Sequence, residues 1–230
     1  PKPSSAASDV YKRQLHARTG PAAMTGTLQR LIAAANLRQA LAAVFALLLG
    51  LGAFMGLQRL VTPRYNWVTP LDELIPFIAQ SWFVYVLFFP FVLLAAAYAS
   101  QEGFRALRNA TGMAFAVGLL CFWLFPEYVP RPDIAALDNG FLQQRLGRMW
   151  QLDLACNGFP SLHVAVTCLA CRALWRRPCK ELSAVIGLLI CLSTLTLKQH
   201  TLIDVAGGLF LALACALATQ RQGNPARVPA

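Results

Sequence analysis

Residues 41–49 read Leu-Ala-Ala-Val-Phe-Ala-Leu-Leu-Leu, an apolar run with no polar position inside it. Strands of a membrane barrel alternate apolar and polar residues, so this run favours a helix. Similar runs recur along the chain, and only 13% of the residues are charged, against about 25% in soluble domains. The pattern predicts an all-α integral membrane protein. Six transmembrane helices are expected, at about residues 39–60, 80–99, 108–125, 161–175, 183–198 and 202–219.

The basic residues lie mainly in the connections between these runs. Because the net charge of +10 is scattered, orientation in a membrane explains it better than nucleic-acid binding does. With the N-terminus in the cytoplasm, the inside segments hold 14 of the 20 lysines and arginines and 3 of the 10 acidic residues. Basic residues favour the cytoplasmic side of a membrane. The bias predicts that both termini are cytoplasmic and that, in a bacterial inner membrane, the outer loops face the periplasm.

Three regions are expected. Residues 1–37 are expected to form a disordered and partly non-native leader with a short amphipathic segment, since the first 23 residues contain no apolar core of a signal peptide. Met24 is the expected true start. Residues 38–220 are expected to form the membrane domain, and residues 221–230 a short cytoplasmic tail.

Six of the seven cysteines lie in or beside apolar runs. Cys168 and Cys171 have the spacing of metal ligands, but they fall within an expected helix and lack a second pair of ligands. We interpret them as small buried hydrophobic residues. Cys156 is the one cysteine expected in an exposed loop. Neither a disulfide framework nor a metal site is predicted.

Two expected outer loops carry polar residues. In the first, residues 61–79, Asp72 and Glu73 are either a catalytic carboxylate pair or, as we prefer, part of a solvated loop or an aid to substrate access. The second, residues 126–160, is long enough to indicate a use. Residues 140–151 within it are expected to form a short interfacial helix with an apolar face made by Phe141, Leu142, Leu146 and Trp150.

The histidines of the membrane domain occur in two stretches, Asn157–His163 and Lys198–Asp204. In the first, Pro160 favours a helix start at residue 160 or 161, because its missing N–H would have no partner there anyway. The free N–H groups of a helix N-terminus favour an anion, and Ser161 adds a hydroxyl donor. His163 then stands on the first turn, near enough to give a proton to a bound group. The alternative is that Ser161 only caps the helix and His163 pairs with a backbone carbonyl.

In the second stretch, His200 and Asp204 are four residues apart, so on a helix they share a face. Asp204 can accept a hydrogen bond from one ring nitrogen and leave the other free, which is the logic of a catalytic triad. A carboxylate at the membrane edge is costly unless it has a partner. Lys198 brings a cation to the same end. The alternative is a surface lysine beside a snorkelling pair.

Together, Phe159–Ala165 and Ser193–Asp204 resemble the motifs of the type 2 phosphatidic acid phosphatase (PAP2) superfamily, most closely those of its inositol phosphorylceramide synthase-like branch. The resemblance covers about residues 38–220 and implies a six-helix transmembrane bundle of the PAP2 type. It also implies that His200 attacks phosphorus, with Asp204 orienting it.

The resemblance implies four further roles. His163 would protonate the leaving oxygen, and Ser161 would bind phosphate oxygens. Arg131, in Pro130-Arg131-Pro132, would clamp the phosphate, and Lys198 would add a charge, as the inositol phosphorylceramide branch suggests. The chain departs from the family at Leu124, Leu162 and Thr194, which stand where the family often has lysine, glycine and arginine.

The function implied is that of a lipid phosphate phosphohydrolase or phosphotransferase that acts at the outer face through a phosphohistidine. Neither a metal ion nor a cofactor is required, because His200 supplies the nucleophile and cationic side chains neutralise the phosphate. The expected partners are the membrane and a lipid phosphate. One alternative is a head-group transferase like inositol phosphorylceramide synthase. Alternatives of another class are a bis-histidine haem membrane protein and a catalytically inactive scaffold. Nothing in the sequence indicates the oligomeric state.

Overall fold

The computed structural model describes residues 35–222, and the side chains of this part up to residue 220. The expected leader therefore lies almost wholly outside the described residues, as does most of the expected tail. In the described part the chain is helical and contains no strand. The expectation of an all-α protein is confirmed.

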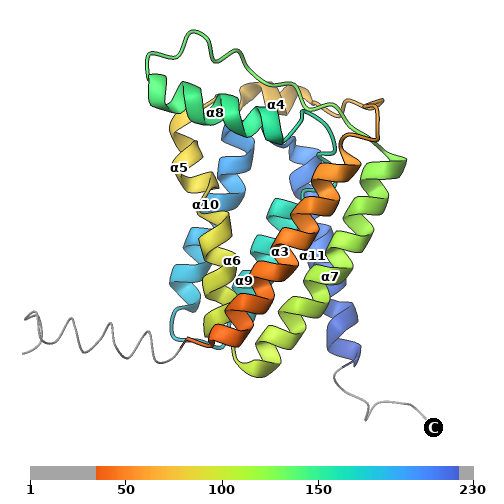
Figure 1. The fold of residues 1–230 in the computed structure, drawn as a ribbon, viewed down its shortest axis with the longest axis vertical. Helices are drawn as coiled ribbons and strands as arrows, with labels where there is room; N and C mark the ends of the chain where they lie inside the picture. Colours follow the sequence, from red (N-terminus) through yellow and green to blue (C-terminus); the bar gives the residue numbers. More distant parts are fainter. Residues whose placement is uncertain (1–34, 223–230) are drawn as a thin grey trace, which may run out of the picture. The chain divides into compact units, whose positions relative to one another are not determined.

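The helical segments follow the predicted apolar runs closely (Figure 1). The first, α3, spans Leu37–Leu57, and α7 spans Gln101–Leu124. The last three are α9 (Leu162–Ala173), α10 (Lys180–Thr196) and α11 (Leu202–Gln222).

The run predicted as one helix at residues 80–99 is broken. It consists of the 3-10 turn η1 (Ala79–Ser81), α5 (Trp82–Tyr85) and α6 (Phe88–Tyr98). The break has a local cause, because Pro90 has no N–H to donate to the carbonyl of Val86 and its ring crowds that carbonyl.

The prediction of six spanning helices is not confirmed. Four segments of the described chain are long and apolar enough to cross a membrane: α3, Ala79–Tyr98, α7 and residues Leu202–Gln220 of α11. The helices α9 and α10 have only 12 and 17 residues. Two further short helices, α4 (Pro70–Leu74) and α8 (Gly140–Leu152), lie in the predicted outer loops.

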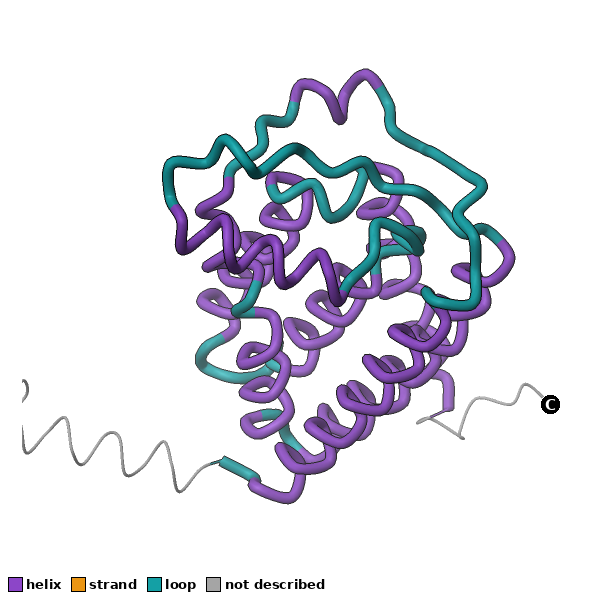
Figure 2. Tube along the Cα trace, turned by 45° about the horizontal axis from the view of Figure 1, so that its top comes forward, coloured by secondary structure: helices purple, strands orange, loops and turns teal. Residues whose placement is uncertain are grey.

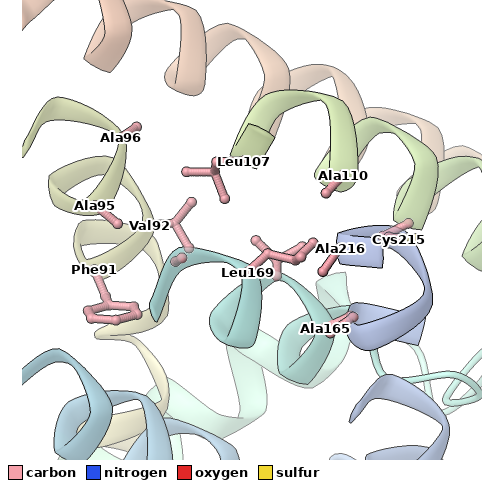
Figure 3. Packing of buried hydrophobic residues seen from close by; sticks show 14 of the residues in the cluster. Phe91, Val92, Ala95, Ala96, Leu107, Ala110, Ala165, Leu169, Cys215 and Ala216 are labelled. Atoms are coloured by element: carbon pink, nitrogen blue, oxygen red, sulfur yellow. The ribbon is translucent and has the colours of Figure 1, made fainter. Parts of the chain in front are cut away.

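The short helix α9 is the centre of the packing. It contacts α6, α7, α10 and α11, and half of its residues are buried. Small side chains allow this close approach. Figure 3 shows Ala95 and Ala96 of α6, Ala110 of α7 and Ala165 of α9 within the buried cluster. By contrast, α3 has only Gln39 buried, and most of its large apolar side chains are exposed, as expected for a surface that faces lipid.

The short helix predicted at residues 140–151 is present as α8. Its N-terminus is capped by the Asn139 side chain, which accepts a 3.1 Å hydrogen bond from the backbone N–H of Leu142. Leu142 and Leu146 are buried. The helix lies across the end of the bundle at which the long connections gather (Figures 1 and 2).

Backbone hydrogen bonds join three of these connections to one another. The N–H of Tyr128 donates to the carbonyl of Tyr65 at 2.7 Å, and the N–H of Asn157 donates to the carbonyl of Glu127 at 3.0 Å. Isolated bridges pair Tyr65 with Glu127 and Tyr128 with Cys156. The connection after α7 is thus fixed between the connections that follow α3 and α8.

Candidate active site

A cavity of about 420 Å³ is lined by residues of α8 and of the bundle helices, both apolar and polar. The apolar side chains come from α3, α5, α6 and α7 and include Leu47, Leu51, Phe54, Phe88 and Phe115. The polar side chains include Arg131, Asp153, Asn157, His163, Gln199 and His200. The two histidines predicted to act together therefore line one space.

His200 lies two residues before α11 rather than on it, which corrects the expectation of two residues on one helix. The helix begins later because Thr201 and Asp204 cap it reciprocally. Thr201 N–H donates to Asp204 Oδ2 at 2.8 Å, and Asp204 N–H donates to Thr201 Oγ1 at 3.3 Å. His200 Nδ1 nevertheless lies 3.5 Å from Asp204 Oδ2. Asp204 is fully buried, whereas the His200 side chain is 12% exposed.

His163 lies on the first turn of α9 and is held by aromatic rings. Its ring stacks on Tyr85 with a centroid distance of 4.3 Å and lies 3.8 Å from the ring centroid of Phe88. Its Nε2 is buried and has no hydrogen-bond partner among the described residues. The ring is thus fixed, with one nitrogen free for a group that enters the cavity.

Arg131 is anchored largely by the backbone. Its guanidinium donates to the carbonyls of Asp153 and, at 3.1 Å, Leu154, and it lies 5.5 Å from the ring centroid of Trp150. One guanidinium nitrogen is 3.8 Å from Asp153 Oδ1. Its Nε has no partner among the described residues. The arginine therefore holds the loop together and leaves one N–H without a partner.

Ser161 and Lys198 are not among the residues that line the cavity. Ser161 caps α9, because its Oγ accepts a 3.3 Å hydrogen bond from the N–H of Val164, so α9 begins after Ser161 rather than at Pro160. Lys198 has a positive φ of 55°, and its Nζ donates to the backbone carbonyl of Asp72 at 2.6 Å. In this structure both side chains make contacts that hold helix ends and loops.

Asp72 is part of the same support and does not form a pair with Glu73. Its Oδ1 accepts a 2.7 Å hydrogen bond from the N–H of Leu202, and its Oδ2 accepts from Thr69. Asp72 is buried and Glu73 is exposed. Neither lines the cavity. Because Asp72 is buried and ties α4 to the start of α11, the interpretation as part of a solvated loop is wrong for this residue.

Comparison with protein families identifies the fold that carries this site. The family model described as the PAP2 superfamily matches residues 65–218, which include both histidine stretches and Arg131. The chain belongs to the PAP2 superfamily. A search of curated proteins and a search of solved structures gave no match. Membership indicates phosphatase-type activity and, with the apolar helices, a membrane protein with a lipid substrate.

Several polar groups at this PAP2 site carry no clear signal in the sequence. Asn157 is buried in the left-handed backbone region at φ 66°, and neither atom of its amide has a partner among the described residues. Arg145 and Arg148 of α8 also line the cavity. Their spacing of three residues indicates only that both lie on one face of a helix, because residues three apart are neighbours on the helix surface.

Cys156 was expected to be exposed, and it is buried. Its Sγ lies 3.7 Å from the carbonyl oxygen of Gln58, and its backbone pairs with Tyr128. Burial raises the pKa of this thiol, as does the charge of Asp153. Cys179 is the exposed cysteine of the described chain.

Proposed function

We propose that this PAP2 protein is a metal-independent lipid phosphate phosphohydrolase or phosphotransferase that works through a phosphohistidine. The observation that carries the proposal is the shared cavity, whose lining combines His163, His200 and Arg131 with many apolar side chains. A lipid phosphate has the same combination, with a charged head and an apolar chain. The lipid would enter from the membrane with its head at the histidines.

In the proposed reaction, His200 Nε2 attacks phosphorus and the bond to the leaving oxygen breaks. The Nδ1–H of His200 faces Asp204, whose charge stabilises the positive ring that forms. His163 gives a proton to the leaving oxygen. A water molecule or an alcohol then attacks phosphorus, gives its proton to His163 and releases His200. Water as acceptor makes a phosphatase, and an alcohol makes a transferase.

Positive charge and fixed donors would stabilise the transferring phosphoryl group, which is usually the largest catalytic contribution. Arg131 is the proposed clamp, and the amide of Asn157 is an additional candidate donor in the same cavity. The family cations missing at Leu124 and Thr194 would be replaced in part by Arg145 and Arg148. Ser161 and Lys198 remain candidates for phosphate binding only through a movement from their present contacts.

We favour the phosphatase as the simpler activity, and a head-group transfer like that of inositol phosphorylceramide synthase is the second candidate. We further propose a bacterial inner membrane location, with the site facing the periplasm. The charge bias supports this orientation, because the Arg172–Lys180 segment at the opposite end is the densest basic cluster.

The deciding experiment measures phosphate release by the purified protein from a panel of lipid monophosphates and diphosphates, with and without an alcohol acceptor. His200→Ala is expected to lose activity, vanadate to inhibit, and EDTA to have no effect. Full activity of His200→Ala would refute the nucleophile, and inhibition by EDTA would refute the metal-independent reaction. A Soret band in the purified protein would favour the haem alternative instead, and no activity on any lipid would favour a scaffold.

A further inference from the structure

Glu127 is a fully buried acid that has no part in the proposed reaction. Glu127 follows α7, and its exposed fraction is 0%. In the described residues no lysine or arginine forms an ion pair with it, and neither carboxyl oxygen meets a donor with hydrogen-bonding geometry. An ionised carboxyl group in such a place is strongly unfavourable. The surroundings therefore favour the neutral acid.

A second carboxyl group faces Glu127 across Gly158. A methyl group placed on Gly158 would lie 2.7 Å from Glu127 Oε2 and 2.7 Å from Asp204 Oδ2. The two carboxyl groups thus converge on one small space, which a glycine leaves open. Asp204 is equally buried, and its Oδ1 also lacks a hydrogen-bond partner among the described residues.

If the two carboxyl groups share one proton, only one negative charge is buried at this place. Burial and the nearby charge of Asp204 raise the pKa of Glu127 to about 9. Like charges so close cannot both be ionised easily. With the proton on Glu127, its O–H can donate a hydrogen bond to Asp204, and the charge of Asp204 stays available to His200.

We propose that Glu127 is a positioning residue for the nucleophilic pair: as a neutral acid it donates a hydrogen bond to Asp204 and holds that carboxylate toward His200. The proposal rests on the proposed function of His200 and deepens it. The backbone of Glu127 is fixed, as a positioning role requires. Its carbonyl accepts a hydrogen bond from Asn157 N–H at 3.0 Å, and its segment pairs with Tyr65.

This arrangement predicts that the activity of the site is lost at alkaline pH. The charged groups that face Glu127 are Asp204 from α11 and, farther away, Asp72 from α4, and both are acidic. Below a pH of about 9 the neutral form of Glu127 dominates and the hydrogen bond is intact. Above this pH the second negative charge repels Asp204 and releases it from its position.

The test compares Glu127→Gln, Glu127→Ala and Glu73→Gln, the last being an exposed glutamate of α4 that serves as the matched control. Glutamine cannot ionise but keeps a donor for Asp204. At pH 7 we expect Glu127→Gln to keep kcat within about threefold, and Glu127→Ala to lose about tenfold or more in kcat with little change in KM, as expected for one charge-assisted hydrogen bond. Above pH 9 the wild type and Glu73→Gln should lose activity, whereas Glu127→Gln should retain it.

A second measurement does not depend on activity. The infrared carbonyl band of a protonated carboxylic acid should be present in the wild type at pH 7, absent in Glu127→Gln and unchanged in Glu73→Gln. Absence of this band in the wild type overturns the proposal, as does an alkaline activity limit in Glu127→Gln that equals that of the wild type. If no lipid phosphate is turned over but the band is present, the proposed function fails while the neutral state of Glu127 stands.

Discussion

The ammonium of Lys198 donates a 2.6 Å hydrogen bond to the backbone carbonyl of Asp72, a residue 126 positions earlier in the chain. The carboxylate of the same Asp72 accepts from the N–H of Leu202 at 2.7 Å. Asp72 therefore binds both sides of the short segment that contains His200. This contact gives α4 a structural role at the site, although none of its residues lines the cavity.

Removing the charge of Asp72 is expected to destabilise the protein. Asp72→Asn replaces one accepting oxygen by an amide nitrogen, so at least one hydrogen bond to a buried charge is lost, at a cost of about 1.5–3 kcal/mol. Thermal unfolding in detergent should show a lower Tm, whereas the exposed Glu73→Gln on the same helix should leave it unchanged. Equal Tm values for the two variants would contradict the role assigned to Asp72.

The same contacts predict an acid dependence of stability. Burial opposes the charged form of Asp72, but hydrogen bonds from Thr69 and Leu202, together with Lys198, hold its pKa below the usual value. Stabilisation by this carboxylate is present above its unfolded pKa of about 3.9 and is lost as the pH falls through the lower folded pKa. Melting temperatures measured below pH 4 should fall more steeply in the wild type than in Asp72→Asn.

His163 is expected to act as the acid that protonates the leaving oxygen. His163→Asn should lower kcat by about 10²–10⁴ for a lipid phosphate, because such proton transfers contribute that much. An activated phosphate ester, whose leaving group needs no proton, should release its first equivalent of leaving group nearly as fast in the variant as in the wild type, whereas later turnovers stay slow because the attacking water still gives its proton to His163. A loss of equal size for both substrates would show that His163 supports the site in another way.

Arg145 and Arg148 are expected to bind the charged head of the substrate. Both line the cavity, and Arg145 lies 5.0 Å from the ring centroid of Phe141. The double replacement by alanine should raise KM by about tenfold, since one charge-assisted hydrogen bond is typically worth that factor, and should lower kcat less. Arg64→Ala, an exposed arginine in the connection after α3, is the control. An unchanged KM in the double variant would exclude this role.

The amide of Asn157 is expected to contact the substrate. Its backbone has a positive φ of 66°, which glycine tolerates well, so Asn157→Gly removes the amide without straining the backbone. This variant should keep its Tm and lose about tenfold in kcat/KM, as expected for one lost hydrogen bond to a charged group. Asn157→Asp should lose more activity, because its charge repels phosphate. Wild-type kinetics in Asn157→Gly would contradict the assignment.

The sequence by itself determined the helical character of this chain and the two stretches that contribute histidines to one cavity. Apolar runs act locally, so the helix positions that they favour are visible in the sequence, and Pro160 marks the start of α9 to within two residues. The break before Pro90 has an equally local cause. The prediction of a single helix at residues 80–99 missed this break, because hydropathy alone does not register the lost N–H of a proline within an apolar run.

Only the tertiary structure decided which polar side chains meet. A serine before a helix has the same sequence pattern whether its hydroxyl caps the helix, as that of Ser161 does, or binds a ligand. Glu127, Asn157 and Gly158 come from two loops joined by backbone hydrogen bonds, and no residue spacing encodes that pairing. The approach of Glu127 to Asp204 depends on how α11 packs against α7 and α9. Burial at that contact, rather than residue type, is what makes Glu127 a neutral acid.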